Sequence, residues 1–355
     1  MKDHAPVAFY APMKSPDHPT PSGDREIARL TLQALQAAGF APFVASHLRL
    51  YDGEGSADAQ RALMAQADSA AENLIETMRP APPCLWYTYH CYFKAPDLIG
   101  PKVTAALGIP YVVAEPSLSP RRLVGPWECF AAASEAAILG ADTLLWSTER
   151  DRPALEAAGA LGRMTELPPF IDVGPAPIPP VRRGWLNLLT VAMMREGEKL
   201  ESYRRLAEAL HLIDEPWRLT IVGDGPARPA IRSMMDAFGK KVSFWGRIES
   251  RDALRRIYEA ADVFVWPGVG EGVGMVYLEA QAAGLPALAE DHTAPRSVTA
   301  ETPARPLDPA DFARRIVEIA RDDDARARAR DHVETHHSIA RAAATLSEHL
   351  GVLIR

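Results

Sequence analysis

Short runs rich in β-branched and aromatic residues alternate with longer stretches of helical periodicity along this chain. In residues 24–38, apolar side chains recur three or four positions apart and Gly39 ends the pattern, which predicts a helix. The predicted strands of the first half are Val7–Ala11, Pro42–Ser46, Leu85–His90, Tyr111–Ala114 and Thr143–Ser147, and its predicted helices include Asp24–Ala38, Ala57–Met78 and Trp127–Leu139. Strands that alternate with helices of this length form parallel sheets with helices on both faces, so the chain is predicted to be an α/β protein.

A proline-rich stretch at residues 167–180 interrupts this alternation, and its fixed φ angles favour an extended connector. Beyond it, the predicted strands are Leu186–Ala192, Arg218–Val222, Val242–Trp245, Val263–Trp266 and Ala287–Ala289, and the predicted helices are Leu200–Ile213, Ala227–Phe238, Arg251–Ala260, Met275–Ala283 and Ala310–Arg321. We therefore predict two Rossmann-like α/β/α domains, residues 1–172 and 186–337, joined by a linker at 173–185. Ligands of such sheets bind beyond the carboxyl ends of the strands, which predicts a site in a cleft between two facing domains.

The charge and the apolar patterning of the chain limit its partners. Its 355 residues carry 39 Lys and Arg against 46 Asp and Glu, a formal net charge of −7, which argues against a general electrostatic grip on nucleic acid. No apolar run approaches the roughly 18 residues of a membrane span. The first residues lack the apolar core of a signal peptide, and Cys84, Cys91 and Cys129 form no CxxC pair. We expect a cytoplasmic protein with reduced thiols.

The segment 263–286 is the most informative part of the sequence. A predicted strand ends at Pro267, a glycine-rich turn containing Glu271 follows, and a helix begins near residues 272–275. Free backbone N–H groups at such a helix start, reached closely past small glycines, favour phosphate binding. Glu271 in the turn and Glu279 two helical turns further on suit a ligand with hydroxyl groups, such as a sugar. Alternatively, Glu271 only complements the positive helix end and Glu279 is a solvated charge.

This segment resembles the E-x7-E motif of retaining glycosyltransferases of family 4, which have the two-domain GT-B fold. The residues that follow Glu279 are similar to the LEAMACGLP run of that family. The resemblance implies that Glu271 holds sugar hydroxyls and that Glu279 holds the ribose. It also implies donor binding at the helix start, by Gly272, Val273, Gly274, Met275 and Val276.

Two further segments resemble the family in order and spacing. Residues 219–226 are similar to its IVGDGP turn, but Arg228 stands where a dinucleotide fingerprint needs a third glycine, so that use is disfavoured and a plain strand-to-helix turn remains the alternative. Residues 242–248 are similar to its VxFxGRV segment, whose backbone reads the nucleotide base. The resemblance therefore places Arg247 and Ile248 near the base.

The segment 191–199 lies where the family has vGRLxxxKG, whose Arg and Lys neutralise the donor diphosphate. Carried over, these cations are Arg195 and Lys199, a fork-shaped and a point-like charge. Met194 replaces the glycine, and the Arg-to-Lys spacing is one residue shorter than usual. The alternative is two solvated charges at a helix start.

The first domain follows the family pattern less closely. Residues 20–25 offer Gly23 where the family has two glycines near the donor phosphate and acceptor. A predicted strand ends at His90, where the family often has a His close to the donor sugar, although a lone His is commonly structural. Lys94 and Glu115 are weaker candidates. Residues 290–298 replace another glycine turn of the family and put the identity of the donor sugar in question.

The resemblance implies a retaining, hexosyltransferase-type glycosyltransferase that moves a sugar from a nucleotide-diphosphate donor to a hydroxyl acceptor and requires no metal or further cofactor. The acceptor would be a glycan, a lipid-linked molecule or a small molecule of bacterial envelope polysaccharide or glycolipid synthesis. We expect no nucleic acid partner and at most peripheral contact with the inner face of the membrane. A C-terminal helix at about 338–355 is expected to pack back on the first domain. The alternatives are a nucleotide-sugar epimerase of the same fold and a non-catalytic scaffold that binds a nucleotide sugar.

Overall fold

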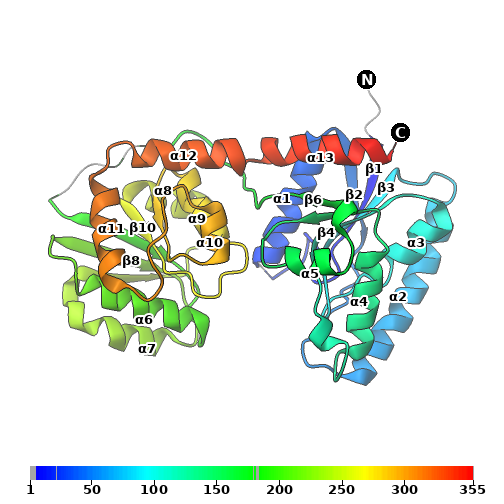
Figure 1. Cartoon of the computed structure of the whole chain (residues 1–355), viewed down its shortest axis with the longest axis horizontal. Helices are drawn as coiled ribbons and strands as arrows, with labels where there is room; N and C mark the ends of the chain where they lie inside the picture. The colour runs from blue at the N-terminus through cyan, green and yellow to red at the C-terminus, as the bar shows by residue number, and fades with distance from the viewer. Residues whose placement is uncertain (1–4, 21, 179, 181–183, 355) are drawn as a thin grey trace. The chain divides into compact units, whose positions relative to one another are not determined.

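The chain divides into two compact units in the computed structural model, which describes residues 5–20, 22–178, 180 and 184–354. Unit 1 comprises Met1–Pro168 and Ile339–Arg355, and unit 2 comprises Pro169–Ser338. Figure 1 labels the elements of both units. Within the described ranges, no helix combines the length and apolar character that crossing a bilayer requires.

Unit 1 contains a six-stranded, all-parallel sheet in the order β2-β1-β3-β4-β5-β6. Its strands are β1 (Ala5–Tyr10), β2 (Phe40–Ser46), β3 (Leu85–Tyr92), β4 (Tyr111–Ser117), β5 (Thr143–Trp146) and β6 (Met164–Glu166). Its helices are α1 (Gly23–Ala37), α2 (Ala57–Met78), α3 (Gly100–Leu107), α4 (Glu128–Leu139), α5 (Arg152–Ala157) and α13 (Ile339–Leu353), with 3₁₀ turns at Pro120–Arg122 and Leu161–Arg163. The strands are buried almost continuously, as expected for a sheet with helices on both faces.

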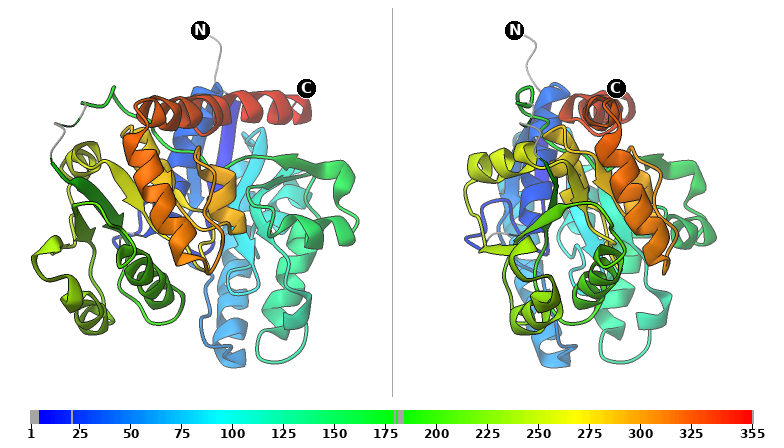
Figure 2. Two further views of the ribbon diagram at one scale, coloured as in Figure 1. Left: turned by 60° about the vertical axis from the view of Figure 1, so that its left-hand side comes forward. Right: turned by 90° about the vertical axis from the view of Figure 1, so that its left-hand side faces the viewer.

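The helix α13 packs along α1, and Figures 1 and 2 both show the red C-terminal helix against the blue one. A chain that leaves unit 1 near residue 168 thus returns to it for its last helix. The α1 helix begins where the side chain of Ser22 accepts a hydrogen bond from the N–H of Arg25. It buries an apolar stripe that includes Leu30 and Leu35, in agreement with the periodicity of the sequence.

Unit 2 contains a five-stranded, all-parallel sheet in the order β11-β10-β7-β8-β9. Its strands are β7 (Leu186–Val191), β8 (Trp217–Val222), β9 (Val242–Gly246), β10 (Val263–Val265) and β11 (Ala287–Leu288). Its helices are α6 (Glu198–Leu210), α7 (Arg228–Met235), α8 (Arg251–Ala260), α9 (Met275–Ala282), α10 (Thr293–Val298), α11 (Pro309–Arg321) and α12 (Ala325–His336), with a 3₁₀ segment at Asp236–Lys241. The α6 helix packs with α7 and α11, whereas α9 packs with α8, α10 and α12. The prediction of two parallel α/β units is therefore confirmed, and the facing of the two sheets across a cleft stays a prediction.

The division between the units differs from the predicted boundary at residue 172. Residues 169–172 belong to unit 2, because Ile171 pairs with Ser338 and its N–H donates to His337 O at 2.8 Å. The ring of His337 in turn bonds Pro169 O at 2.7 Å. Of the predicted linker 173–185, positions 179 and 181–183 lie outside the described residues.

Short elements account for most of the other differences. The strand β6 and the helices α3, α5 and α10 were not predicted, because three to eight residues carry too little periodicity to stand out. The helical stretch expected at residues 324–355 is two helices, α12 and α13, with a break after His336.

Candidate functional site

The carboxyl ends of the parallel strands of unit 2 bring together the turns that the sequence singled out. These turns follow β7, β8, β9, β10 and β11, and all leave the sheet at the same edge. Glu271 lies in the turn after β10, and Lys199 lies in the first turn of α6, which follows β7.

Glu271, Lys199 and Trp266 form the centre of this edge. The Nζ atom of Lys199 makes an ion pair with Oε1 of Glu271, and Trp266 Nε1 donates to the same oxygen at 2.8 Å. Lys199 Nζ also lies 5.6 Å from the centroid of the Trp266 ring. The side chains of Lys199 and Glu271 are 23% and 14% exposed, so both charges can be reached by a ligand while being partly shielded from water. Structure thus joins two residues that the sequence predicted separately, and adds Trp266.

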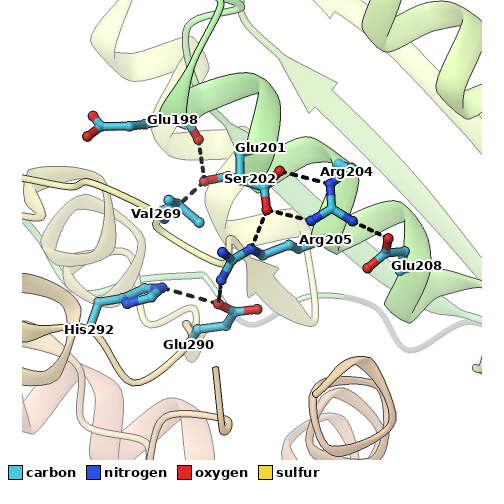
Figure 3. A network of polar contacts seen from close by, with 9 residues as sticks. All are labelled: Glu198, Glu201, Ser202, Arg204, Arg205, Glu208, Val269, Glu290 and His292. Carbon is cyan, nitrogen blue, oxygen red and sulfur yellow. Dashed lines mark hydrogen bonds and ion pairs between the residues drawn. The ribbon is translucent and has the colours of Figure 1, made fainter. Parts of the chain in front are cut away.

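The turn that carries Glu271 is fixed to α6 through Ser202, as Figure 3 shows. Ser202 Oγ accepts the N–H of Val269 at 3.0 Å and donates to Glu198 O at 3.0 Å. Gly270 has φ +66°, and a Cβ atom on it would lie 2.1 Å from Cδ of Glu198. The positive φ of Gly270 favours glycine where the turn passes α6, and a side chain there would also displace the Glu198 carboxylate. Sequence analysis did not predict these roles of Ser202 and Glu198.

A second polar network ties the turn after β11 to α6 (Figure 3). Glu290 is 3% exposed, and its Oε2 accepts hydrogen bonds from Arg205 Nη1 at 2.5 Å and pairs with His292 Nε2 at 3.1 Å. Arg205 also bonds Glu201 at 2.8 Å. A carboxylate buried this deeply would be strongly destabilising without such partners. The segment 290–298, where the chain departs from the family pattern, is therefore an ordered turn followed by α10.

The start of α9 offers backbone N–H groups to a ligand. Its N-cap, Gly274, has φ +82° and makes no side-chain capping bond. A Cβ atom at Gly272 would meet no atom within 4 Å, so a ligand can approach the backbone closely there. Val273 is half-buried, and the neighbouring Met275 and Val276 pack partly against the core of unit 2. The side chains of Met275 and Val276 anchor the helix to the core, and the binding of a donor by the backbone of residues 272–276 stays a prediction.

Glu279 is held by a buried tyrosine. Tyr258, which is 2% exposed, donates its hydroxyl to Oε2 of Glu279 at 3.1 Å. Burial raises the pKa of Tyr258 well above its ordinary value, and the nearby charge of Glu279 raises it further. This contact argues against Glu279 as a merely solvated surface charge.

The turn that carries Arg195 is clamped by the turn after β8. Met194 is fully buried. Its N–H donates to Asp224 O at 3.0 Å, and its carbonyl oxygen accepts from the N–H of Ala227 at 2.9 Å. A Cβ atom at Gly225 would lie 2.3 Å from Met194 O. The IVGDGP-like segment thus serves as a close-packed turn, which agrees with the plain structural interpretation of its glycines. Arg195 itself is exposed in the turn that leads to α6.

The proposed base-reading residues lie apart from the Glu271 centre. Arg247 is 61% exposed, and its Nη2 lies 3.7 Å from Oε1 of Glu249. Ile248 packs partly against the core of unit 2. For the residues that the structure describes, neither makes a hydrogen bond or ion pair with Glu271 or Lys199.

Unit 1 has a polar cluster at the carboxyl edge of its own sheet. His90 Nδ1 lies 2.9 Å from Oδ1 of Asp24, and the imidazole stacks on Tyr92 with ring centroids 4.7 Å apart. Asp24 follows Gly23 in the first turn of α1, and a Cβ atom at Gly23 would meet no atom within 4 Å. Sequence predicted His90 and Gly23 here, but it did not predict that Asp24 would orient the imidazole.

Two strained residues lie side by side in this cluster. His90 has φ +60° and Glu115 has φ +48°, both in the left-handed region that non-glycine residues seldom adopt. They are level with each other, because β3 and β4 pair Tyr89 with Ala114 and Cys91 with Pro116 on either side. Strain of this kind costs about 1–3 kcal/mol per residue and gathers at functional sites.

The charges of the cluster perturb one another. Burial alone would lower the pKa of His90, but the hydrogen bond with Asp24 and the charge of Glu115 outweigh it and raise the pKa above its ordinary value. The pKa of Asp24 is lowered, because the bond with His90 outweighs the effect of burial. Burial raises the pKa of Glu115, and the charge of His90 offsets this rise only in part. The cluster therefore favours a protonated imidazole.

Comparison with known proteins places this architecture among the GT-B glycosyltransferases. The lipopolysaccharide outer core galactosyltransferase WaaB has the same fold, with a TM-score of 0.69 at 15% identity over 98% of this chain and 99% of that one. The Anabaena protein HepE, solved with UDP and glucose, has a TM-score of 0.68 at 13% identity over 99% and 100% of the two chains.

Sequence comparison adds a match to a family model. Residues 186–322 match the model of the family "Glycosyl transferases group 1". A GDP-mannose-dependent monoacylated alpha-(1-6)-phosphatidylinositol monomannoside mannosyltransferase of Corynebacterium glutamicum is 40% identical over 93 residues, 24% of each chain. A GDP-mannose-dependent alpha-(1-6)-phosphatidylinositol dimannoside mannosyltransferase of Mycobacterium tuberculosis is 29% identical over 180 residues, 48% of this chain and 46% of that one. The matches span a quarter to a half of these relatives. The predicted relationship to GT-B glycosyltransferases is confirmed.

Proposed function

We propose that the protein is a retaining glycosyltransferase that transfers a hexose from a nucleotide-diphosphate sugar to a hydroxyl acceptor. The observation that carries the proposal is the Lys199–Glu271–Trp266 centre beside the open start of α9. It places a cation and uncapped N–H groups, which suit a diphosphate, next to a carboxylate, which suits sugar hydroxyls. The ribose would lie at Glu279, and the base near Arg247 and Ile248.

The chemical demand of this reaction is to stabilise the diphosphate as it leaves. Lys199, Arg195 and the N–H groups of α9 supply positive potential there, so we expect donor binding without a metal ion. Glu271 would have two roles, because it accepts from Lys199 and Trp266 and its carboxylate would also accept hydrogen bonds from sugar hydroxyls. Retention would follow from attack of the acceptor on the face that the diphosphate leaves.

The names of the relatives favour a role in glycolipid or envelope polysaccharide synthesis. Both mannosyltransferases use GDP-mannose and act on phosphatidylinositol mannosides, and WaaB acts on the lipopolysaccharide core. We propose a bacterial, cytoplasmic enzyme that contacts the inner face of the membrane at most peripherally, with a glycan, a lipid-linked molecule or a small molecule as acceptor.

Calorimetric titration with UDP, GDP and ADP and their common sugars, with and without magnesium, tests the donor site. One nucleotide should bind wild-type protein without metal. Lys199→Ala should weaken its binding about tenfold, the loss of one charge-assisted bond worth about 1.4 kcal/mol. The matched control Lys240→Ala removes an exposed lysine of the same unit and should change nothing. Equal losses in the two variants, or no binding to wild-type protein, would contradict the assignment.

Product analysis with the bound donor then separates transfer from its alternatives. Release of nucleotide that depends on an added acceptor supports a transferase. Release without acceptor would indicate an epimerase or hydrolase, and binding without turnover would indicate a scaffold. Glu271→Ala and Arg195→Ala should both lower transfer strongly while the protein stays folded; near-normal transfer in both would refute the roles given to them.

A further inference from the structure

Trp266 is firmly held at the Glu271 centre. It follows β10 directly and is fully buried. Its backbone is fixed on both sides, because its N–H donates to Leu288 O at 3.1 Å and its carbonyl oxygen accepts from the hydroxyl of Tyr277 at 3.0 Å. Its ring meets the ring of Tyr203 edge to face, with centroids 4.9 Å apart. The indole Nε1–H is therefore a fixed donor, aimed at Oε1 of Glu271 over 2.8 Å.

Lys199 contacts the same carboxylate oxygen but is far less constrained. Its ammonium ends a flexible four-carbon stem, and the side chain is 23% exposed. In the proposed function this ammonium binds the donor diphosphate, whose oxygens attract it away from Glu271. The indole of Trp266 cannot move with it, because the ring is packed in the core. When a donor is bound, Oε1 of Glu271 thus keeps one of its two donors.

The other oxygen of Glu271 is the one that a ligand can use. Among the described residues, no group forms a hydrogen bond or ion pair with Oε2, and the side chain is 14% exposed. The backbone of Glu271 is set by its N–H, which donates to Gly268 O at 3.2 Å. With the backbone and Oε1 both held, the direction of Oε2 is held as well. A carboxylate that turned freely would lose conformational entropy on meeting a hydroxyl, so fixing it beforehand strengthens binding.

We propose that Trp266 is a positioning residue for the donor sugar: its Nε1–H holds the Glu271 carboxylate in place while the diphosphate engages Lys199, so that Oε2 accepts from a sugar hydroxyl. This inference rests on the proposed transferase function and adds what distinguishes a nucleotide sugar from the bare nucleotide. Both ligands present the diphosphate, but only one presents sugar hydroxyls. The indole bond should therefore strengthen the binding of the nucleotide sugar and leave that of the nucleotide nearly unchanged.

NMR of the ligand-free protein tests whether the indole holds Glu271 without the lysine. The proton–nitrogen signal of the Trp266 indole is assigned through the backbone resonances of the same residue. This signal should move little in Lys199→Met, which removes the ammonium and keeps an unbranched side chain. It should move strongly upfield in Glu271→Gln, which replaces the charged acceptor by a neutral one. A larger shift in Lys199→Met than in Glu271→Gln would overturn the proposal, because the carboxylate would then follow the lysine.

Calorimetric titration tests the effect on the donor, with UDP against UDP-glucose and GDP against GDP-mannose. Trp266→Phe keeps an aromatic ring near Lys199 but loses the N–H. It should weaken binding of the nucleotide sugar about tenfold, the size expected for a hydrogen bond to a charged group, and that of the nucleotide less than about threefold. Trp217→Phe is the matched control, since Trp217 is also buried in the core of unit 2 and makes no contact with Glu271 in the described structure. It should change both affinities less than about threefold.

The outcomes separate this inference from the function on which it rests. A loss confined to the nucleotide sugar in Trp266→Phe, and absent from Trp217→Phe, supports the positioning role. Equal losses for nucleotide and nucleotide sugar would overturn that role and leave the donor site standing, because they would report a general disturbance of the unit. Failure of wild-type protein to bind either pair would overturn the proposed function and this inference together. If Trp266→Phe does not fold, the NMR comparison of Lys199→Met with Glu271→Gln decides.

Discussion

Replacing Gly225 by alanine tests whether the turn after β8 holds the turn that carries Arg195. The added Cβ atom would lie 2.3 Å from Met194 O and 2.9 Å from Met194 C. These are backbone atoms of a fully buried residue, fixed by hydrogen bonds of 3.0 and 2.9 Å to Asp224 O and Ala227 N. Gly225 also has φ +152°, which side chains disfavour. The overlap cannot be relieved by turning a flexible side chain.

Two costs add at this position. An unfavourable backbone conformation costs about 1–3 kcal/mol. Overpacking against a fixed neighbour costs about 1–3 kcal/mol more. We therefore expect Gly225→Ala to lower the free energy of unfolding of unit 2 by about 4 kcal/mol, a large part of the stability of an ordinary domain. Because Arg195 directly follows Met194, the affinity for the donor nucleotide should fall as well.

Urea unfolding monitored by tryptophan fluorescence measures this loss, as a lower midpoint at constant slope. Gly239→Ala is the matched control, since Gly239 has φ +54° but a Cβ atom there would meet no atom within 4 Å. Gly239→Ala should lose only the cost of the unfavourable backbone conformation, about 1–3 kcal/mol. If the two variants lose the same stability, the close packing of the two turns does not constrain the chain and the reasoning fails.

Two further predictions concern charged groups. Asp24→Asn should lower the pKa of His90 in an NMR titration, because it removes the carboxylate that stabilises the imidazolium; an unchanged pKa would show that the contact is not formed in solution. In the wild type, protonated His90 stabilises the fold fully at pH values below the pKa of the imidazole in the unfolded chain. This stabilisation is lost as the pH rises through the higher pKa that His90 has in the folded protein. In unit 2, burial would raise the pKa of Asp311, but the N–H of Arg305 and the guanidinium groups of Arg314 and Arg315 lower it to about 2. This stabilisation is present above the unfolded pKa of about 3.9 and is lost as the pH falls through about 2, so Asp311→Asn should remove about 2 kcal/mol of acid-sensitive stability in unfolding experiments between pH 7 and 2.

The strand and turn pattern of unit 2 follows directly from the sequence. The five predicted strands of this unit match β7 to β11 within one or two residues at each end. Short runs rich in apolar and β-branched residues between turn residues are a local signal, because strands of a parallel sheet that is covered on both faces carry mostly apolar side chains. The glycine-rich turn and the start of α9 are local in the same way, which is why Glu271 and the residues after it could be singled out.

The pairing of distant residues, by contrast, was decided by the tertiary structure. Lys199 and Glu271 are 72 positions apart, and Asp24 and His90 are 66 apart. Nothing in the spacing of Trp266 or Asp24 showed which carboxylate or imidazole it would contact. The spacing of Lys94 likewise did not show its neighbours. In the described structure Lys94 lies over the ring of Trp127, which it shares with Arg122, and makes no contact with His90.

The sequence by itself determined that the chain forms parallel α/β sheets and that its conspicuous glycine turns lie at their carboxyl edges, because periodicity and turn residues act over a few positions. Only the tertiary structure decided which turns pack together and which charges meet. The clamp of Gly225 on Met194 and the left-handed backbone of His90 beside Glu115 both arise from strand order, which sets neighbours that are far apart in the chain. Residue periodicity reports which side of an element is buried but not what it is buried against, so the partners of each site residue had to come from the fold.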